Sequence, residues 1–288
     1  MKMKRTKRVL FLLPSLVILI GFTYLPLIIG LIMSLFGGNG QDLAFVGLDN
    51  YIALVDDANF KTAFINSIEF SIIISPIVLV LSIALAIGLN SIKNKRVHGA
   101  ILILLYLPCI TSPIAYSLFF KQLAYSDGLL TQLFYIFGIG AGDESILANP
   151  IIAKLFISFI CVWAWTGFYV LIINSALQNM DISIIKAAKI DGASSFRILI
   201  KIILPSLASV LLLVVILTSC SAFQIYIEIS LITKGGPAMS TFTLVFYLYR
   251  KTFTYVADYG YSIAIGMVIL LISLFISSIF LIVKKVSR

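Results

Sequence analysis

Six long apolar segments, separated by polar ones, dominate the pattern of hydrophobic and polar positions along the chain. The first is a charge-free run from Val9 to about Phe36, and the others cover approximately residues 63–89, 101–120, 151–176, 204–227 and 259–283. A helix needs about 20 apolar residues to cross the hydrocarbon core of a bilayer, and each segment is at least that long. The pattern therefore predicts an all-α, polytopic membrane protein with about six transmembrane helices.

The first segment is predicted to be a retained transmembrane helix, not a cleaved signal. It is longer than the apolar core of a signal peptide, and no small-residue cleavage site follows it. Pro14 and Pro26 are expected to kink it, and Pro108 and Pro113 to interrupt the third segment. An apolar stretch at Leu129–Ile139 is expected to lie along the membrane surface.

Composition and charge agree with a lipid environment and give an orientation. Of the 288 residues, 61% are hydrophobic and 11% are charged, whereas a soluble domain is about half apolar and one quarter charged. The two ends, the segment between the second and third helices and the segment between the fourth and fifth hold 15 of the 21 Lys and Arg residues. Such an excess marks the cytoplasmic side, so both termini are predicted to be cytoplasmic. The net charge of +9 is therefore assigned to membrane orientation and not to nucleic-acid binding.

The polar stretch Ser183–Pro205, between the fourth and fifth segments, is predicted to be a cytoplasmic elbow. A short helix is expected from about residue 183 to residue 191, with Asp181 or Ser183 as its N-cap. Gly192 is expected to end that helix, because glycine adopts positive φ without steric penalty.

A second helical turn is expected to start at Ser194 or Ser195, and Pro205 is expected to mark the start of the next apolar helix. The elbow could be a simple joining loop or a docking surface for a soluble partner. Charge alone leaves both interpretations open.

The sequence carries no enzyme signature. It lacks the glycine-rich G-x-x-x-x-G-K-[ST] loop that binds ATP, and it lacks the common hydrolase and metalloprotease motifs. Cys109, Cys161 and Cys220 all fall in apolar runs without metal-ligand spacing, so they are interpreted as small packed residues. Transport, conduction and membrane assembly remain as functional classes.

Acidic residues within the spans would be expected of an ion-coupled carrier. Glu69 is placed near the outer boundary of the second span and Glu228 at an outer helix end, so both are interpreted as interfacial. A spanning protein without an ATP site or a clear ion relay, but with a cytoplasmic elbow, suits a permease driven by a separate ATPase.

Several motifs resemble those of binding-protein-dependent ABC importer permeases. K-A-A-K-I-D-G-A-S at 186–194, followed by I-I-L-P at 202–205, is similar to the EAA loop of that family, in which E-A-A-x-x-D-G-A precedes I-x-L-P. The sugar-permease branch is resembled by V-G-L-D-N-Y at 46–51, L-P at 107–108, G-G-P at 235–237 and the aromatic pattern near 249–261. The motifs occur in the family's order and cover nearly the whole chain.

The resemblance implies a protein of a bacterial or archaeal cell membrane that imports a sugar or oligosaccharide. It implies a second, different permease subunit, two ATPase subunits that bind ATP and Mg²⁺, and an extracytoplasmic solute-binding protein; this chain would bind no cofactor itself. Residues 1–62 would form a first transmembrane helix and an extracytoplasmic loop, and residues 63–288 the permease core with a coupling loop at 181–205.

By the same resemblance the elbow is the helix that docks in a cleft of the ATPase. Small side chains would allow close approach, Asp191 would cap the following helix, and Gly192 would set the angle between the two helices. Lys186 stands where the family has Glu, so the usual salt bridge does not transfer. The positions assigned to ATPase coupling are Lys186, Ala187, Ala188, Asp191, Gly192 and Ala193.

The resemblance also places sugar contacts in the middle of the third, fourth and fifth spans. Trp165 and Phe168 are three residues apart and share a helix face, so one sugar could stack on both, although packing is an equally good explanation. Gln224 is the preferred polar contact, because an unpaired amide in a span is costly. The full set is Cys109, Ser112, Cys161, Trp165, Phe168, Ser221, Gln224 and Tyr226.

Two alternatives remain. An ion-coupled secondary sugar carrier would need an essential carboxylate such as Glu69, and a membrane scaffold or channel would function without any ATPase.

Overall fold

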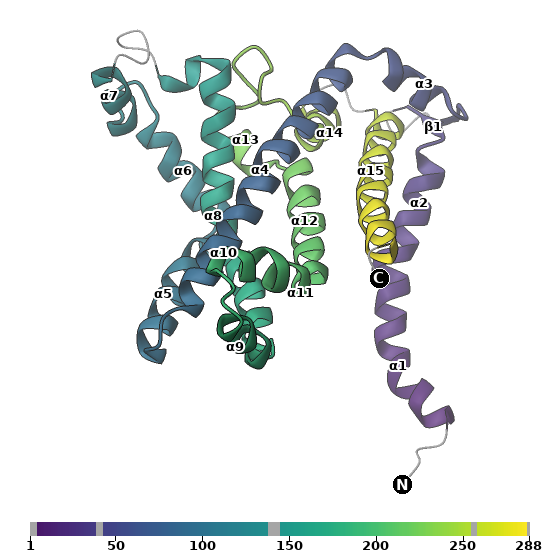
Figure 1. The fold of residues 1–288 in the computed structure, drawn as a ribbon. Coiled ribbons are helices and arrows are strands. Elements are labelled where there is room, and N and C mark those ends of the chain that lie inside the picture. Colours follow the sequence, from purple (N-terminus) through teal and green to yellow (C-terminus); the bar gives the residue numbers. More distant parts are fainter. Residues whose placement is uncertain (1–4, 39–42, 138–144, 255–257, 287–288) are drawn as a thin grey trace. The chain divides into compact units, whose positions relative to one another are not determined.

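The computed structural model describes residues 5–38, 43–137, 145–254 and 258–286 and is built almost entirely of helices (Figure 1). Within these ranges, five helical segments are long and apolar enough to cross a membrane, or six when a sharply bent pair counts as one span. The predicted all-α, polytopic architecture is therefore confirmed. Lys2, Lys4, Asp42, Asp143, Glu144 and Arg288 lie outside the described residues.

The chain divides into two compact units, of which the first comprises residues 1–61 and 247–272. Its elements are α1 (Arg5–Leu19), α2 (Leu25–Met33), the short antiparallel strands β1 (Phe36–Gly37) and β2 (Ala44–Phe45), α3 (Asp49–Asp56), the end of α14 (Leu244–Phe253) and the first part of α15 (Tyr259–Val286).

A wide turn joins α1 to α2 within the first predicted span. At Ile20–Tyr24 the helix is π-helical, and the Leu25 N–H bonds to the Ile20 carbonyl five residues back. Pro26 follows directly, and since a proline ring crowds the carbonyl four residues before it, a locally wider helix relieves that contact. Where a kink was expected at Pro26, the helix has a wide turn just before it, while Pro14 lies inside α1.

The end of α2 is held against the start of α15. The Asn50 amide donates to the carbonyls of Ser34 (2.8 Å) and Phe36 (2.9 Å). A Cβ on Gly260 would lie 1.6 Å from the Phe36 oxygen, so this approach requires glycine. Earlier along α2, Gly30 lies against Met267, which agrees with the side-by-side course of α2 and α15 in Figure 1.

Asp57, just after α3, accepts hydrogen bonds from two tyrosine hydroxyls that lie far from it in the sequence. Its carboxylate accepts hydrogen bonds from Tyr247 and from Tyr261, the latter at 2.5 Å. The Lys251 ammonium lies 4.9 Å from the centre of the Tyr261 ring. Burial alone would raise the pKa of Asp57, but the hydrogen bonds from Tyr247 and Tyr261 outweigh it and the pKa is lowered.

The second unit comprises residues 62–246 and 273–288. Its helices are α4 (Ala58–Asn90), α5 (Lys95–Ile110), α6 (Pro113–Leu123), α7 (Leu129–Ile136), α8 (Pro150–Gln178), α9 (Ile182–Ile190), α10 (Ser195–Ile198), α11 (Leu204–Ser206), α12 (Ala208–Phe223), α13 (Ile227–Ile232), the start of α14 and the last part of α15, with a short 3₁₀ turn at Ile146–Ala148.

The third predicted span is broken into α5 and α6, which meet at 88°. The break falls at Thr111, which is extended, and Ser112, which has φ of −55° and ψ of 129°, and Pro113 begins α6. A residue before proline avoids the α region, which explains the position of the break. The interruption predicted at Pro113 is confirmed, whereas Pro108 stays within α5.

The core of the second unit surrounds α8, where Ile157, Ile160, Val170 and Ile173 have no exposed surface. Helix α5 crosses α8 so closely that a Cβ on Gly167 would lie 1.8 Å from the Leu105 oxygen. Hydroxyl groups contribute as well, since Ser75 of α4 and Thr218 of α12 are hydrogen-bonded at 2.7 Å. Small residues and interhelical hydroxyl contacts are typical of helix packing in membranes.

Candidate functional site

The elbow between the fourth and fifth spans is a helix closed by a complete Schellman motif. Asp181 is the N-cap of α9 and accepts from the Ser183 N–H at 2.9 Å, as predicted. Gly192 has φ of +77°, its N–H bonds to the Lys189 carbonyl, and the Ala193 N–H bonds to the Ala188 carbonyl at 2.9 Å. These two bonds satisfy carbonyls that a helix end leaves free, so the angle of the elbow is fixed by backbone geometry.

One detail of the predicted elbow is wrong. Asp191 does not cap the following helix: it is the C-cap residue of α9, and the hydroxyl of Ser194 caps α10 by accepting from the Arg197 N–H at 3.3 Å. Pro205 lies in the first turn of α11, as predicted, although the backbone before it is already helical. Helical backbone runs from Ser195 through a π-helical turn at Leu199–Ile203 into α11, and Pro205 lies inside this path.

The elbow presents both apolar and cationic groups on its surface. Ile190 and Phe196 are 86% and 71% exposed, in a segment that is predicted to lie outside the bilayer. The cations of the elbow, together with four of its predicted coupling residues, are exposed, and Ala188 and Ala193 are half-buried. The exposed cations are Lys186, Lys189, Arg197 and Lys201, and the exposed coupling residues are Lys186, Ala187, Asp191 and Gly192. The arrangement suits a partner groove that is apolar with acidic edges.

The residues predicted to contact sugar fall into separate environments. Cys161 is fully buried, and Trp165 is half-buried and packs on the cluster that includes Tyr116 and Phe156. Phe168 instead lies edge-to-face with Tyr169, with ring centres 5.2 Å apart. Trp165 and Phe168 therefore have different neighbours, and a shared sugar-stacking face stays a prediction.

The remaining predicted contacts are mostly exposed. Cys109 and Ser112 lie exposed at the break between α5 and α6, and Ser221 is exposed beside the Tyr169 hydroxyl. Gln224, also exposed, donates to the Ser273 hydroxyl at 3.1 Å, so its amide is partly satisfied within the chain. Tyr226 is half-buried, and its ring lies 6.3 Å from that of Phe246.

Two polar contacts in the spans were not predicted. Glu228 was expected at an interface, but it is only 5% exposed, and it accepts a hydrogen bond from the Tyr116 hydroxyl at 2.5 Å. Its interfacial position stays a prediction, but this burial was not expected: α13 turns Glu228 toward α6. The second contact is the ion pair of Glu69 with Lys154, whose ammonium also donates to Asn66 at 3.0 Å. The acid of one span and the cation of another were visible in the sequence, but their pairing was not.

Asn66 also anchors the segment that contains the G-G-P motif. Its amide nitrogen donates to the Met239 carbonyl at 2.8 Å and the Phe242 carbonyl at 3.0 Å, and the neighbouring Ser67 hydroxyl accepts from the Leu244 N–H at 3.0 Å. Helix α4 thus holds this connecting segment by its backbone.

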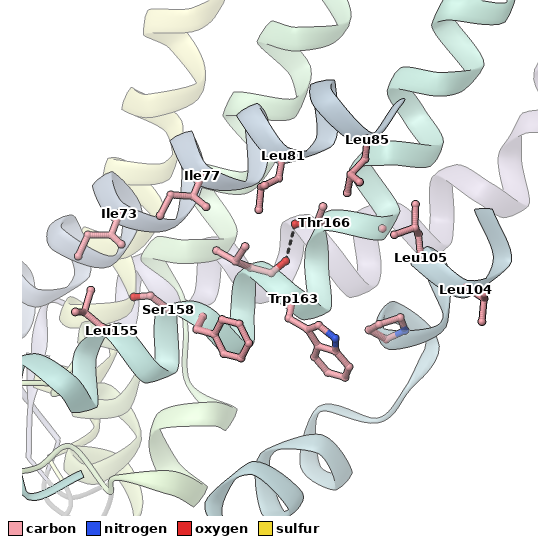
Figure 2. A pocket seen from close by; sticks show the side chains of 14 residues that line it. Ile73, Ile77, Leu81, Leu85, Leu104, Leu105, Leu155, Ser158, Trp163 and Thr166 are labelled. Atoms are coloured by element: carbon pink, nitrogen blue, oxygen red, sulfur yellow. Dashed lines mark hydrogen bonds between the residues drawn. The ribbon is translucent and has the colours of Figure 1, made fainter. Parts of the chain in front are cut away.

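An apolar groove of about 490 Å³ lies between α4, α5 and α8. Figure 2 shows Ile73, Ile77, Leu81 and Leu85 along α4, opposite the side chains of α8. The hydroxyls of Ser158 and Thr166 in its lining each bond to a carbonyl of their own helix, at 2.8 Å and 2.6 Å. The groove therefore offers few hydrogen-bonding groups to a sugar, and it is not the predicted sugar site.

Comparison with known proteins defines the class of this one. Residues 78–288 match the family described as "Binding-protein-dependent transport system inner membrane component". The chain belongs to this family, and the resemblance drawn from the elbow motif is confirmed. It is a multi-pass permease subunit of the inner membrane, and ATP hydrolysis in such systems belongs to a separate subunit.

Individual relatives are similar over nearly the full length. The lactose transport system permease protein LacF of Rhizobium radiobacter is 34% identical over 264 residues, covering 91% of this chain and 88% of LacF. The arabinooligosaccharides transport system permease protein AraP of Bacillus subtilis is 28% identical over 283 residues, covering 96% of this chain and 88% of AraP. A chain from the crystal structure of a bacterial alginate ABC transporter in complex with an alginate pentasaccharide-bound periplasmic protein shares the fold, with a TM-score of 0.81, 20% identity and coverage of 97% and 94%.

Proposed function

We propose that this permease subunit carries a sugar or oligosaccharide into the cytoplasm, driven by a separate ATPase that docks on the elbow at residues 183–205. The observation that carries the proposal is the rigid, exposed elbow, closed by the Schellman motif at Gly192, in a chain of this permease family. The names of LacF and AraP, which specify lactose and arabino-oligosaccharides, support a sugar as cargo.

The partners follow from the same proposal. A second, different permease subunit would complete the pathway, two ATPase subunits would bind ATP and Mg²⁺, and an extracytoplasmic binding protein would deliver the sugar. The binding protein named with the alginate transporter structure supports the last of these. Residues 63–288 would form the transporting core, which the family match at 78–288 supports.

The elbow can transmit force because it is continuous with a span. From Ser195 the backbone stays nearly helical through α10, the wide turn at Leu199–Ile203, α11 and α12. A displacement of α9 by the ATPase would therefore move the fifth span as a rigid body. The apolar side chains Ile190 and Phe196 would be buried in the docking cleft.

The sugar pathway would use the exposed polar groups near the bend of the third span and the end of α12. Cys109, Ser112, Ser221 and Gln224 offer hydroxyl, thiol and amide groups at the surface of the subunit, where a second permease would face them. Trp165, Phe168, Tyr226 and Cys161 would supply aromatic and packing surface behind this layer.

The Glu69–Lys154 ion pair argues against an ion-coupled carrier. A coupling carboxylate must bind and release its ion during each cycle, whereas Glu69 is already neutralised by an ammonium within the subunit. Uptake that remains fully dependent on ATP in a Glu69→Gln variant would count against that alternative.

The experiment is uptake and ATP hydrolysis by the reconstituted transporter, with its ATPase and binding protein. Gly192→Pro and Asp191→Arg are expected to insert normally but to hydrolyse ATP without moving sugar, because proline cannot adopt a φ of +77°. Gly192→Asn is the matched control, because asparagine tolerates this region. Normal uptake by Gly192→Pro would defeat the coupling role, and failure of any ATPase to copurify would favour a scaffold or channel.

A further inference from the structure

Tyr116 of α6 and Glu228 of α13 form a buried polar contact. Neither residue belongs to a motif that the sequence analysis identified. The Tyr116 hydroxyl donates to Oε1 of Glu228 at 2.5 Å, and each residue is 5% exposed. Trp165 of α8 packs against the same cluster of buried residues as Tyr116. The surroundings are apolar, since Tyr116 packs in one cluster with Ile160, Ala164 and Ile232.

A hydrogen bond to a carboxyl group is strong in such surroundings. Because both side chains are buried, water cannot replace the lost partner when the contact opens. Separating the two groups would therefore leave two buried polar groups without a hydrogen bond. Contacts of this kind have one favoured arrangement and resist gradual stretching. The bond should therefore hold α6 and α13 together during a rigid-body motion.

The Tyr116–Glu228 contact joins two helices that belong to different spans. Helix α13 follows α12 after Gln224, Ile225 and Tyr226, and α12 is the span that continues from the elbow. Helix α6 is the part of the third span beyond its 88° bend. The contact thus links the far end of the span that begins at the elbow to the half-span beyond the bend.

We propose that the Tyr116–Glu228 hydrogen bond is the link through which movement entering at the elbow reaches α6. Tyr116 and Glu228 are positioning residues: they make α6 follow α12 and α13 when the ATPase displaces α9. This inference rests on the proposed function, since it needs an ATPase-driven displacement. It goes further by naming which part of the third span moves and which bond moves it.

The test measures sugar molecules moved per ATP hydrolysed in proteoliposomes with the complete transporter. Tyr116→Phe removes a single oxygen atom and Glu228→Leu removes the acceptor, and both are expected to keep ATP hydrolysis while transport per ATP falls roughly tenfold, the factor expected for losing one such bond. Glu228→Gln keeps an acceptor for the tyrosine and is expected to retain coupling. Tyr135→Phe on α7, where the ring is 60% exposed, is the matched control and should match wild type.

A second readout separates a link from a merely stabilising contact. Nitroxide labels at the exposed positions Leu118 on α6 and Leu217 on α12 are expected to keep a constant distance between nucleotide-free and vanadate-trapped states in wild type. In Tyr116→Phe the distance should differ between the two states. An unchanged distance together with normal transport per ATP in that variant would overturn the inference. Wild-type transporter that hydrolyses ATP but moves no sugar would instead overturn the proposed function.

Discussion

The crossing of α5 over α8 at Gly167 yields a prediction whose size follows from the geometry. An alanine Cβ there would lie 1.8 Å from the Leu105 oxygen and 2.6 Å from its carbonyl carbon. A Cβ atom in a protein does not approach a non-bonded heavy atom closer than about 3.0 Å. The backbone of α5 at Leu105 would therefore have to move away by at least about 1.2 Å. Because the obstacle is backbone, no rotamer change can relieve it.

We expect Gly167→Ala to destabilise the subunit by about 3 kcal/mol, the upper end of the range for overpacking. For a chain of this size that corresponds to a fall in melting temperature of roughly 6–12 °C. Thermal unfolding of the purified permease in detergent, followed by tryptophan fluorescence, measures the fall.

Two helical glycines serve as controls for Gly167. A Cβ on Gly88 of α4 or on Gly99 of α5 meets nothing within 4 Å. Alanine at either position should leave stability unchanged or raise it by about 0.5–1 kcal/mol, because a helix interior favours alanine over glycine. A Gly167→Ala melting temperature within about 1 °C of wild type would refute the reasoning, because it would mean that the helices do not cross this closely.

Three further predictions concern hydrogen bonds. Asn66→Leu leaves the carbonyls of Met239 and Phe242 without their donor, and it should destabilise the protein by about 2–4 kcal/mol and speed proteolysis of the segment 233–243; equal cleavage rates in wild type and variant would contradict this. Because the pKa of Asp57 is lowered in the folded protein, its ionised carboxylate stabilises the fold fully above the ordinary carboxyl pKa of about 4. This stabilisation is lost as the pH falls through the pKa of the folded state. Asp57→Asn should therefore narrow the difference in melting temperature between pH 7 and pH 3. An unchanged difference would show that the tyrosine bonds do not favour the ionised form. Ser194→Ala removes the N-cap of α10 and should weaken protection of its amides from hydrogen exchange by about 1 kcal/mol, while Ser195→Ala, one residue inside the helix, serves as the control.

Features set by neighbouring residues could be predicted from the sequence. The spans follow from apolar length, and the elbow follows from Asp181 and Gly192, a cap and a left-handed glycine whose effects reach only a few residues. Their positions agree with the structure to within a residue or two. The break before Pro113 is of the same local kind.

Contacts between distant residues could not be predicted in this way. Glu69 pairs with a lysine 85 residues away, and Glu228 with a tyrosine 112 residues away. Which helices pack together depends on how well their side-chain surfaces complement each other, and this complementarity cannot be derived from one sequence. Glu228 was placed at an outer helix end, and its burial could not be predicted because it depends on the short helix α13 packing against α6.

The first compact unit has a consequence for biosynthesis. Its two stretches, 1–61 and 247–272, are separated by 185 residues that belong to the other unit. A ribosome that adds about 5–20 residues per second makes the second stretch roughly 10–40 s after the first. During that interval the Asp57 carboxylate has neither of its donors, Tyr247 and Tyr261, and the Phe36 backbone has no Gly260 to pack against. The early span, Leu12–Met33, has no buried residue and can remain in lipid by itself. A nascent chain arrested before residue 247, however, leaves this unit incomplete and accessible to membrane proteases.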